Sequence, residues 1–433
     1  MMKKRVKRLL AGGLALCMTA GLVACGKDSN KEKGGDASLG VKNLMEGVTA
    51  QAATPDNKIA EESLAAITDF SVRLLQNCVT EDAKENTILS PLSVLYALAM
   101  TENGAEGDTL QQMEEVFGLS RDEMNQALQN YKKLLPSGEK YQVTMANSIW
   151  FTEEESRKFV ANKEFLQKNA DCYDAEIYQA LFDNATKDAI NLWVEDATDG
   201  QIENILAKID PNAIMYLVNA ISFDAEWQEI YQEYQVRERE FTGASGKKQT
   251  IDFMHSKEFA YLEDENAVGM MKYYSGRRYA FVALLPNEAM TVEEYVNSLD
   301  GAALRKLLDD KQNVEVNVLL PKFTCEADYS MRDILIRMGM KDAFDDILAN
   351  FDGMGTVPDG YNIMINEVIH KAKIEVNEKG TKAGAATVVE MATGAAMPME
   401  KPKEVILDRP FVYMLLDTAR NVPIFVGTVM ELQ

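Results

Sequence analysis

The chain has 433 residues, of which 46% are hydrophobic and 26% are charged, and its formal net charge is −23. This composition provides enough apolar surface for a soluble globular fold. So acidic a chain repels nucleic acid and anionic lipid, which argues against a nucleic-acid partner.

The first 24 residues have the pattern of a targeting segment rather than of a folded element. A basic stretch at residues 3–8 precedes a short apolar run, Leu9–Ala20, and the sequence Leu-Val-Ala-Cys that ends at Cys25 resembles a bacterial lipobox. The apolar run is too short to span a membrane. We therefore predict a lipoprotein signal peptide over residues 1–24 and lipidation of Cys25. An ordinary secretory signal with an incidental cysteine is the alternative.

The segment that follows, residues 25–58, is polar and rich in Gly, Lys, Asp and Ser, and we predict a flexible tether there. A lipid on Cys25 would hold the protein outside the cytoplasm, on the surface of a bacterial membrane. Loss of the five positive charges of the leader would change the net charge from −23 to −28. The remaining cysteines, Cys78, Cys172 and Cys325, are odd in number and scattered, so we expect free thiols.

No set of catalytic residues is evident in the sequence. It has two histidines, His255 and His370, and it contains no G-x-S-x-G, H-E-x-x-H or P-loop motif and no Cys/His cluster. His370 lies in a strand-like run, where a histidine usually has a structural hydrogen-bonding role. We therefore predict that the protein is not an enzyme and that it has no catalytic residues, metal or cofactor.

The segment Glu375–Met391 (EVNEKGTKAGAATVVEM) contains few large side chains. If it formed a strand, alternate positions from Thr381 to Met391 would share an uncharged face, and Lys382 and Glu390 would lie on the other face. The uncharged face suits a slot within a sheet, where a long side chain would overpack. Its glycines and alanines are poor strand formers. The pattern indicates a segment that switches between a loop and an inserted strand. A flexible surface loop is the alternative.

Ten stretches, in order and at compatible spacing, resemble the serpins, the serine protease inhibitor superfamily. They are Asn86–Met100, Met145–Phe151, Ile190–Ile202, Leu217–Trp227, Phe281–Glu288, Leu320–Phe323, Met338–Asp345, Ile369–Gly380, Asp408–Asp417 and the segment described above. The resemblance covers residues 59–433. It implies an α+β fold with a large central mixed sheet, additional sheets and about eight to nine helices. It also implies a metastable monomer with an exposed reactive-centre loop at about residues 378–404.

The resemblance implies a suicide-substrate mechanism that needs no catalytic group in the inhibitor. A target serine protease, or a cysteine protease as the second class, attacks the loop and forms a covalent acyl-enzyme. The freed loop then inserts into the main sheet and distorts the protease before hydrolysis is complete. The acidic charge argues against a heparin-type activator, which needs a basic patch.

The resemblance also assigns roles to individual residues. It implies a polar shutter cluster beneath the sheet, an aromatic residue at the breach where insertion begins, and an ion pair at the top of that opening. The shutter residues are Ser90, Ser93, Asn219 and His370, the breach residue is Trp227, and the ion pair is Lys322 with Glu378. The hinge residues are Glu378, Gly380, Thr381, Ala383, Ala385, Ala386 and Thr387.

The spacing of the family places the reactive bond at Gly394–Ala395. The loop is several residues longer than usual, so Ala396–Met397 and Met399–Glu400 remain as alternatives. Residues 393–397 are small or unbranched, which favours an elastase-like or subtilisin-like target over a trypsin-like one.

Two other functions remain open at this stage. One is a non-inhibitory serpin that acts as a binding or storage protein and is cleaved as a plain substrate. The other is an anchored solute-binding lipoprotein, which would explain the lipobox but none of the ten stretches.

Overall fold

The computed structural model describes residues 40–51, 58–79, 85–381 and 402–432. None of the helices in these ranges has both the length and the apolar character needed to cross a membrane.

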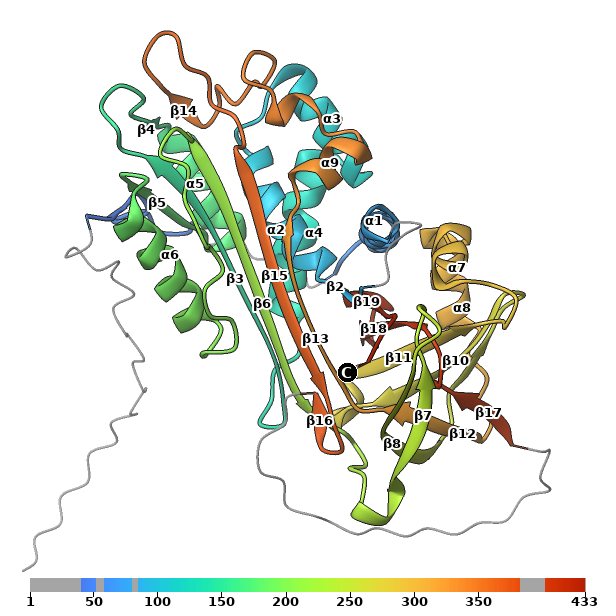
Figure 1. The fold of residues 1–433 in the computed structure, drawn as a ribbon. Coiled ribbons are helices and arrows are strands. Elements are labelled where there is room, and N and C mark those ends of the chain that lie inside the picture. Colours follow the sequence, from blue (N-terminus) through green and yellow to red (C-terminus); the bar gives the residue numbers. More distant parts are fainter. Residues whose placement is uncertain (1–39, 52–57, 80–84, 382–401, 433) are drawn as a thin grey trace, which may run out of the picture. The chain divides into compact units, whose positions relative to one another are not determined.

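The largest sheet has seven strands in the order β1-β5-β3-β6-β16-β15-β13 (Figure 1). β3 pairs antiparallel with β6, whereas β6 pairs parallel with β15, so the sheet is mixed. Its strands are β1 (Lys42–Asn43), β5 (Glu176–Ala180), β3 (Tyr141–Thr152), β6 (Met215–Glu226), β16 (Gly380–Thr381), β15 (Glu367–Val376) and β13 (Phe323–Ser330).

Three smaller sheets complete the strands of the described part. The six-stranded sheet contains β2 (Thr87–Leu89), β19 (Val422–Val429), β18 (Phe411–Asp417), β11 (Tyr279–Pro286), β10 (Ala267–Tyr273) and β9 (Tyr261–Glu263). The four-stranded sheet contains β17 (Lys403–Ile406), β12 (Val316–Pro321), β8 (Lys248–Glu258) and β7 (Val236–Thr242). The two-stranded sheet contains β14 (Gly355–Thr356) and β4 (Val160–Ala161).

Nine α-helices lie in the described ranges, which agrees with the predicted α+β class. They are α1 (Glu61–Cys78), α2 (Pro91–Glu102), α3 (Gly107–Phe117), α4 (Arg121–Leu134), α5 (Lys163–Tyr173), α6 (Asn184–Ala197), α7 (Val292–Ser298), α8 (Gly301–Asp309) and α9 (Arg332–Met338). Three short 3-10 turns are η2 (Glu233–Gln235), η3 (Ser275–Arg277) and η4 (Asp342–Phe344).

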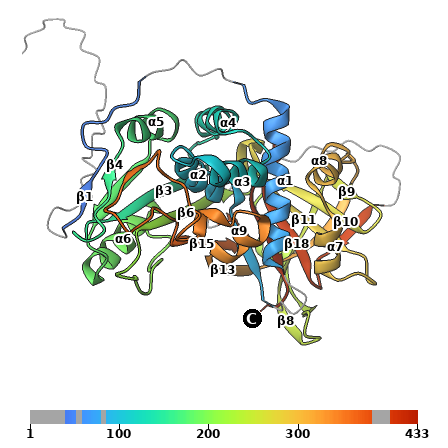
Figure 2. The same ribbon diagram turned by 90° about the horizontal axis from the view of Figure 1, so that it is seen from above.

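Both faces of the main sheet are covered, because successive strand residues point to opposite sides. On β6, Leu217 and Ile221 belong to the larger hydrophobic core, whereas Tyr216 and Val218 belong to a smaller one completed by Ile190 of α6. Figure 2 shows α2, α3, α4 and α5 along one side of the sheet. The two cores thus hold β3, β6 and β15 in place from both sides of the sheet. The hinge enters between two of these strands, β6 and β15.

The central helix α2 is buried along its whole length. Its start is well defined, because Ser90 is the N-cap residue, its Oγ accepts a hydrogen bond from the amide of Ser93, and Pro91 follows at the first helical position. A helix that is apolar all round is stable only within a core. This position places Ser90 and Ser93 directly beneath the main sheet.

Part of the predicted flexible tether, residues 25–58, is folded onto the domain, because Lys42–Asn43 form an edge strand of the main sheet. β1 pairs antiparallel with β5, and Leu44, Met45 and Val48 pack half-buried against the larger core. Two strand residues among glycines and lysines make no periodic pattern, so periodicity could not predict this element. The predicted signal peptide, residues 1–24, lies outside the described residues.

Candidate functional site

The hinge enters the main sheet between β6 and β15. After β15 the chain turns back, and β16 pairs antiparallel with β6 through Gly380–Glu226 and Thr381–Ala225. Thr381 also pairs with Val376 at the end of β15. Two hinge residues therefore already lie within the sheet.

Further along the sheet, β6 and β15 pair directly with each other. This parallel pairing runs from Glu367–Tyr216 to Lys371–Ala220. Because the two strands are hydrogen-bonded neighbours there, no strand lies between them over this stretch. The two residues of β16 have entered the sheet, and β6 and β15 remain paired with each other further along.

Gly380 lies where the hinge backbone passes closest to β6. A Cβ atom at this position would overlap the carbonyl oxygen of Ala225. A backbone oxygen in a ladder cannot move aside cheaply, so any residue larger than glycine would force the hinge or β6 to shift.

Thr381 points into the interior and is 1% exposed. Its hydroxyl is hydrogen-bonded to the phenol of Tyr274, which is itself fully buried. Burial raises the pKa of Tyr274 well above its ordinary value, so the phenol stays neutral. The inward orientation of Thr381 is the one that the alternation along the hinge predicts.

Trp227 holds the hinge from the side of β6. Its ring stacks on Tyr274 with centroids 4.4 Å apart and an interplanar angle of 12°. Its indole Nε1 donates to the carbonyl oxygen of Asn377 at 2.8 Å, and its amide donates to that of Lys379 at 2.9 Å. The predicted breach residue thus contacts the backbone on both sides of Glu378.

Lys322 and Glu378 form the ion pair that the resemblance implies, with Nζ and Oε2 3.0 Å apart. Lys322 also lies 3.3 Å from Asp252. Partial burial alone would lower the pKa of Lys322, but hydrogen bonds to Glu378 and Asp252 outweigh it and raise that pKa. The pKa of Glu378 is lowered, first by a hydrogen bond from its own backbone amide and then by Lys322. Both groups therefore remain charged near neutral pH.

The four predicted shutter residues lie together beneath the sheet, and all are fully buried. His370 on β15 contacts the side-chain oxygen of Asn219 on β6 through Nδ1. The Asn219 amide donates to Oγ of Ser93 at 2.6 Å, and Oγ of Ser90 donates to the carbonyl of Ile424 at 2.8 Å. The cluster connects β6, β15 and α2, which are the elements that must separate if a strand is to enter.

The hydrogen bonds of His370 define its tautomer. Nε2 accepts from the amide of Ser90 at 3.0 Å, so the ring proton is on Nδ1 and is donated to Asn219. Burial lowers the pKa of His370 to about 3. The ring is therefore neutral near neutral pH and acts as a structural hydrogen-bonding group.

Sequence reasoning missed two residues that complete these contacts. Asn147 on β3 lies opposite Asn219 and accepts a hydrogen bond from it at 2.5 Å. Tyr274 follows β10 and connects Trp227 to Thr381. Asn147 could have been identified from the sequence, because it is a polar residue within the apolar stretch Met145–Phe151. No local pattern marks Tyr274.

Several predicted site residues lie outside the described ranges. They are Cys25, Ala383, Ala385, Ala386, Thr387, Gly394, Ala395, Ala396, Met397, Met399 and Glu400.

The thiols are poorly suited to nucleophilic attack. Burial raises the pKa of Cys78 to about 12 and that of Cys325 to about 11, and it also raises the pKa of Cys172. Near neutral pH these thiols remain protonated. Within the described part of the chain, no group of three or more His, Cys, Asp and Glu side chains is arranged to hold a metal ion.

Comparisons with known proteins identify the family. The family model described as "Serpin (serine protease inhibitor)" matches residues 65–432. Leukocyte elastase inhibitor of Bos taurus is 30% identical over 382 residues, which cover 85% of this chain and 98% of the relative.

Two solved structures extend this likeness to the fold. The thermophilic serpin tengpin in its native state is 43% identical, with a TM-score of 0.85 over 90% of this chain and 100% of tengpin. Tengpin in its latent state is 41% identical, with a TM-score of 0.76 over 87% of this chain and 99% of tengpin. Membership of this family supports a role in protease inhibition in general. The chain belongs to the serpin family.

Proposed function

We propose that the protein is a suicide-substrate inhibitor of serine proteases, with cysteine proteases as a second class, and that it traps its target as an acyl-enzyme. The hinge geometry is the observation that supports this most directly. Gly380 and Thr381 already lie between β6 and β15, and direct pairing of those strands begins only at Lys371 and Ala220. A cleaved loop would extend as a new strand from this starting point.

The bait bond in this proposal is Gly394–Ala395. The serine Oγ of the protease attacks the carbonyl carbon of Gly394, and the C–N bond between Gly394 and Ala395 breaks. The serine proton passes through the protease's base to the departing α-amine of Ala395. An ester then joins Gly394 to the protease. Loop insertion must be faster than hydrolysis of this ester, and about 1.4 kcal/mol in either barrier changes the ratio of rates tenfold.

Insertion is favourable because an added strand gains hydrogen bonds along both neighbours and buries one face. It is opposed by the shutter cluster, because Asn219 lies on β6 and His370 lies on β15. Separation of these strands leaves buried polar groups temporarily without partners, which is costly. We infer that the cluster holds the sheet closed until the loop is cut.

For the target we propose proteases with a small or shallow apolar specificity pocket, of elastase-like or subtilisin-like type. Residues 393–397 are Thr, Gly, Ala, Ala and Met, which such a pocket accepts. The name of the bovine relative, leukocyte elastase inhibitor, supports the same class of target. The nearest basic residues are Lys401, which precedes Pro402, and Lys403 on β17, so weak or no inhibition of trypsin is expected.

We also propose that the protein is anchored to the outside of a bacterial membrane by a lipid on Cys25. The lipobox-like sequence supports this proposal. Metabolic labelling with a fatty acid should mark the parent chain in the membrane fraction. Cys25→Ser should lose the label and leave the membrane. Equal labelling of the two proteins would exclude lipidation at this residue.

The inhibitory mechanism is tested by mixing a soluble form that lacks residues 1–25 with an elastase-like protease and with a subtilisin-like protease. A denaturant-stable adduct with the mass of protease plus inhibitor, together with a released C-terminal peptide that begins at Ala395, is the expected result. Cleavage without an adduct by both proteases would instead favour a non-inhibitory serpin that is a plain substrate.

A further inference from the structure

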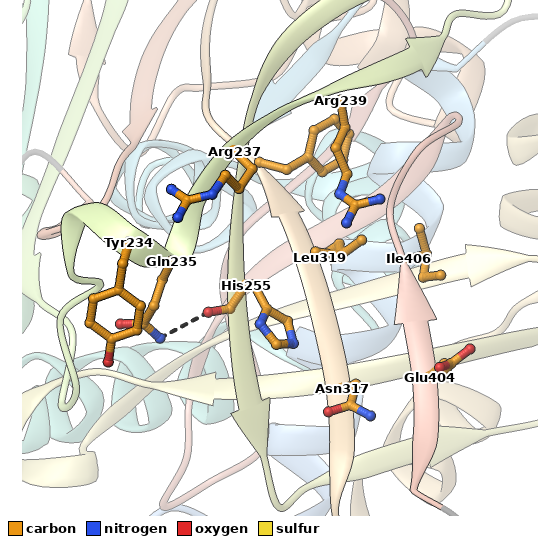
Figure 3. Close-up of a pocket in the computed structure, with 10 residues that line it drawn as sticks. Tyr234, Gln235, Arg237, Arg239, His255, Asn317, Leu319, Glu404 and Ile406 are labelled. Atoms are coloured by element: carbon orange, nitrogen blue, oxygen red, sulfur yellow. Dashed lines mark hydrogen bonds between the residues drawn. The ribbon is translucent and has the colours of Figure 1, made fainter.

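The four-stranded sheet has an open face beside the strand that follows the reactive-centre loop. A shallow depression of about 470 Å³ lies on this face, and its lining includes Tyr234, Arg237, Arg239, His255, Glu404 and Ile406 (Figure 3). Tyr234 is 71% exposed and Ile406 is 36% exposed. A small ligand would remain largely in contact with water here, so the face suits a macromolecular surface better.

Strand register explains how these side chains come to share one face. Leu319 of β12 pairs with Ile406 of β17 on one side and with His255 of β8 on the other. Arg237 and Arg239 are two residues apart on β7, so they project to the same side of the strand. A row of mainly apolar side chains thus lies next to two guanidinium groups.

The two arginines form no ion pair with any described residue. Arg237 donates from Nη1 to the backbone carbonyl oxygens of Glu233 and Val236, which fixes its guanidinium without neutralising it. Glu404 is the one carboxylate among the residues that line the depression. In a chain with a net charge of −23, a face with two arginines free of carboxylate partners in the described part is suited to bind acidic side chains.

The face lies within reach of a protease that is attached to the bait bond. Ala395 and Lys403 are eight residues apart, which an extended chain spans in at most about 29 Å. A protease domain of about 230 residues has a radius of gyration of about 17 Å. Its surface beside the active-site cleft can therefore reach β17 while the bait bond occupies that cleft.

We propose that this face is a secondary docking surface for the target protease, and that it accepts an acidic segment beside the protease's active-site cleft. This inference rests on the proposed inhibitory function. Carboxylates of the protease would pair with Arg237 and Arg239, and apolar atoms would pack on Tyr234 and Ile406. The surface would raise the association rate and would select acidic proteases from among those with the same specificity pocket.

The test compares two variants that change the net charge equally. R237E/R239E reverses the charge of the docking surface, whereas K163E/K208E reverses two exposed lysines, one on α5 and one after α6. Binding is measured with a subtilisin-like protease of net negative charge whose nucleophilic serine is replaced by alanine, so no trapping is required. Melting temperatures verify that both variants are folded.

We expect R237E/R239E to slow association about tenfold at low salt and K163E/K208E to slow it less than twofold. The difference should shrink in 0.5 M NaCl, where screening is strong. Equal effects of the two variants, or no effect of R237E/R239E, would overturn the docking surface. The same proteins mixed with the active protease test trapping separately, because the absence of an adduct would contradict the proposed function without bearing on docking.

Discussion

The hydroxyl of Thr381 is hydrogen-bonded to the phenol of Tyr274 at the point where the hinge enters the main sheet. Tyr274 is held in place by its stack on Trp227. One buried hydrogen bond thus joins the first insertable side chain of the hinge to the fixed part of the molecule.

Tyr274→Phe should loosen the hinge while leaving the sheet intact. Loss of one partner of a buried hydrogen bond costs about 1 kcal/mol, which corresponds to roughly a fivefold faster exchange of the Gly380 and Thr381 amides with deuterated water. Tyr295→Phe is the matched control, because it removes a hydroxyl that is bonded to Asp264 elsewhere in the fold. Identical hinge exchange in the parent and in Tyr274→Phe would mean that this bond does not hold the hinge.

Thr381→Arg should convert the protein from an inhibitor into a substrate. Thr381 is 1% exposed, and an unpaired arginine there would cost several kcal/mol, which slows insertion relative to hydrolysis of the acyl-enzyme. The measurement is the number of inhibitor molecules cleaved per protease trapped. Lys379→Arg, which places the same side chain on the exposed side of the hinge, should trap protease as the parent does. If Thr381→Arg traps protease with the same stoichiometry as the parent, the loop does not insert with the Thr381 side chain on its buried face.

Stability should fall in acid because of His370. Burial lowers the pKa of His370 to about 3, against about 6.5 in the unfolded chain, so between these values the unfolded state binds more protons. The contribution of His370 to the free energy of unfolding is therefore fully present above pH 6.5. It is lost as the pH falls toward 3, at about 1.4 kcal/mol per pH unit.

Urea unfolding of the parent and of His370→Gln between pH 4 and pH 7 measures this contribution. The variant should be less stable at pH 7, and its stability should depend less steeply on pH. His255→Gln removes the exposed histidine and should keep the slope of the parent. Parallel slopes for the parent and His370→Gln would contradict a neutral, buried imidazole.

Glu102 should make the folded protein less stable as the pH rises, whereas His370 makes it less stable as the pH falls. It is fully buried at the end of α2, and neither carboxylate oxygen has a hydrogen-bond partner among the described residues. Burial, assisted by Glu114, raises the pKa of Glu102 to about 8, so the native state retains a proton that the unfolded chain has lost. The contribution of Glu102 to the free energy of unfolding is fully present below pH 4.5 and is lost as the pH rises toward 8.

Glu102→Gln preserves the size of the side chain and removes the ionisation. The free energy of unfolding of this variant should decline less than that of the parent between pH 5 and pH 8. Glu115→Gln, an exposed change on the neighbouring helix α3, should behave as the parent. If all three proteins decline equally, the Glu102 carboxyl is already ionised at neutral pH.

The sequence was most informative where a local pattern carries its own physical meaning. Alternation along the hinge predicted an inward Thr381, and Thr381 is buried. The strand-like run around His370 predicted a structural hydrogen-bonding role, and His370 bonds to Ser90 and Asn219. The half-buried Leu44, Met45 and Val48 were missed, because their element is too short for periodicity to reveal.

The sequence by itself determined the parity of the hinge, because parity depends on side-chain type and on short-range spacing. Its ten stretches also implied the fold class through their resemblance to the serpins. Only the tertiary structure decided that Asn147 faces Asn219, that Tyr274 connects Trp227 to Thr381, and that two hinge residues are already inserted. It alone brought Arg237 and Ile406 onto one open face. The reason is physical: periodicity says which way a side chain points, whereas its partners depend on strand register and packing between segments that are far apart in the sequence.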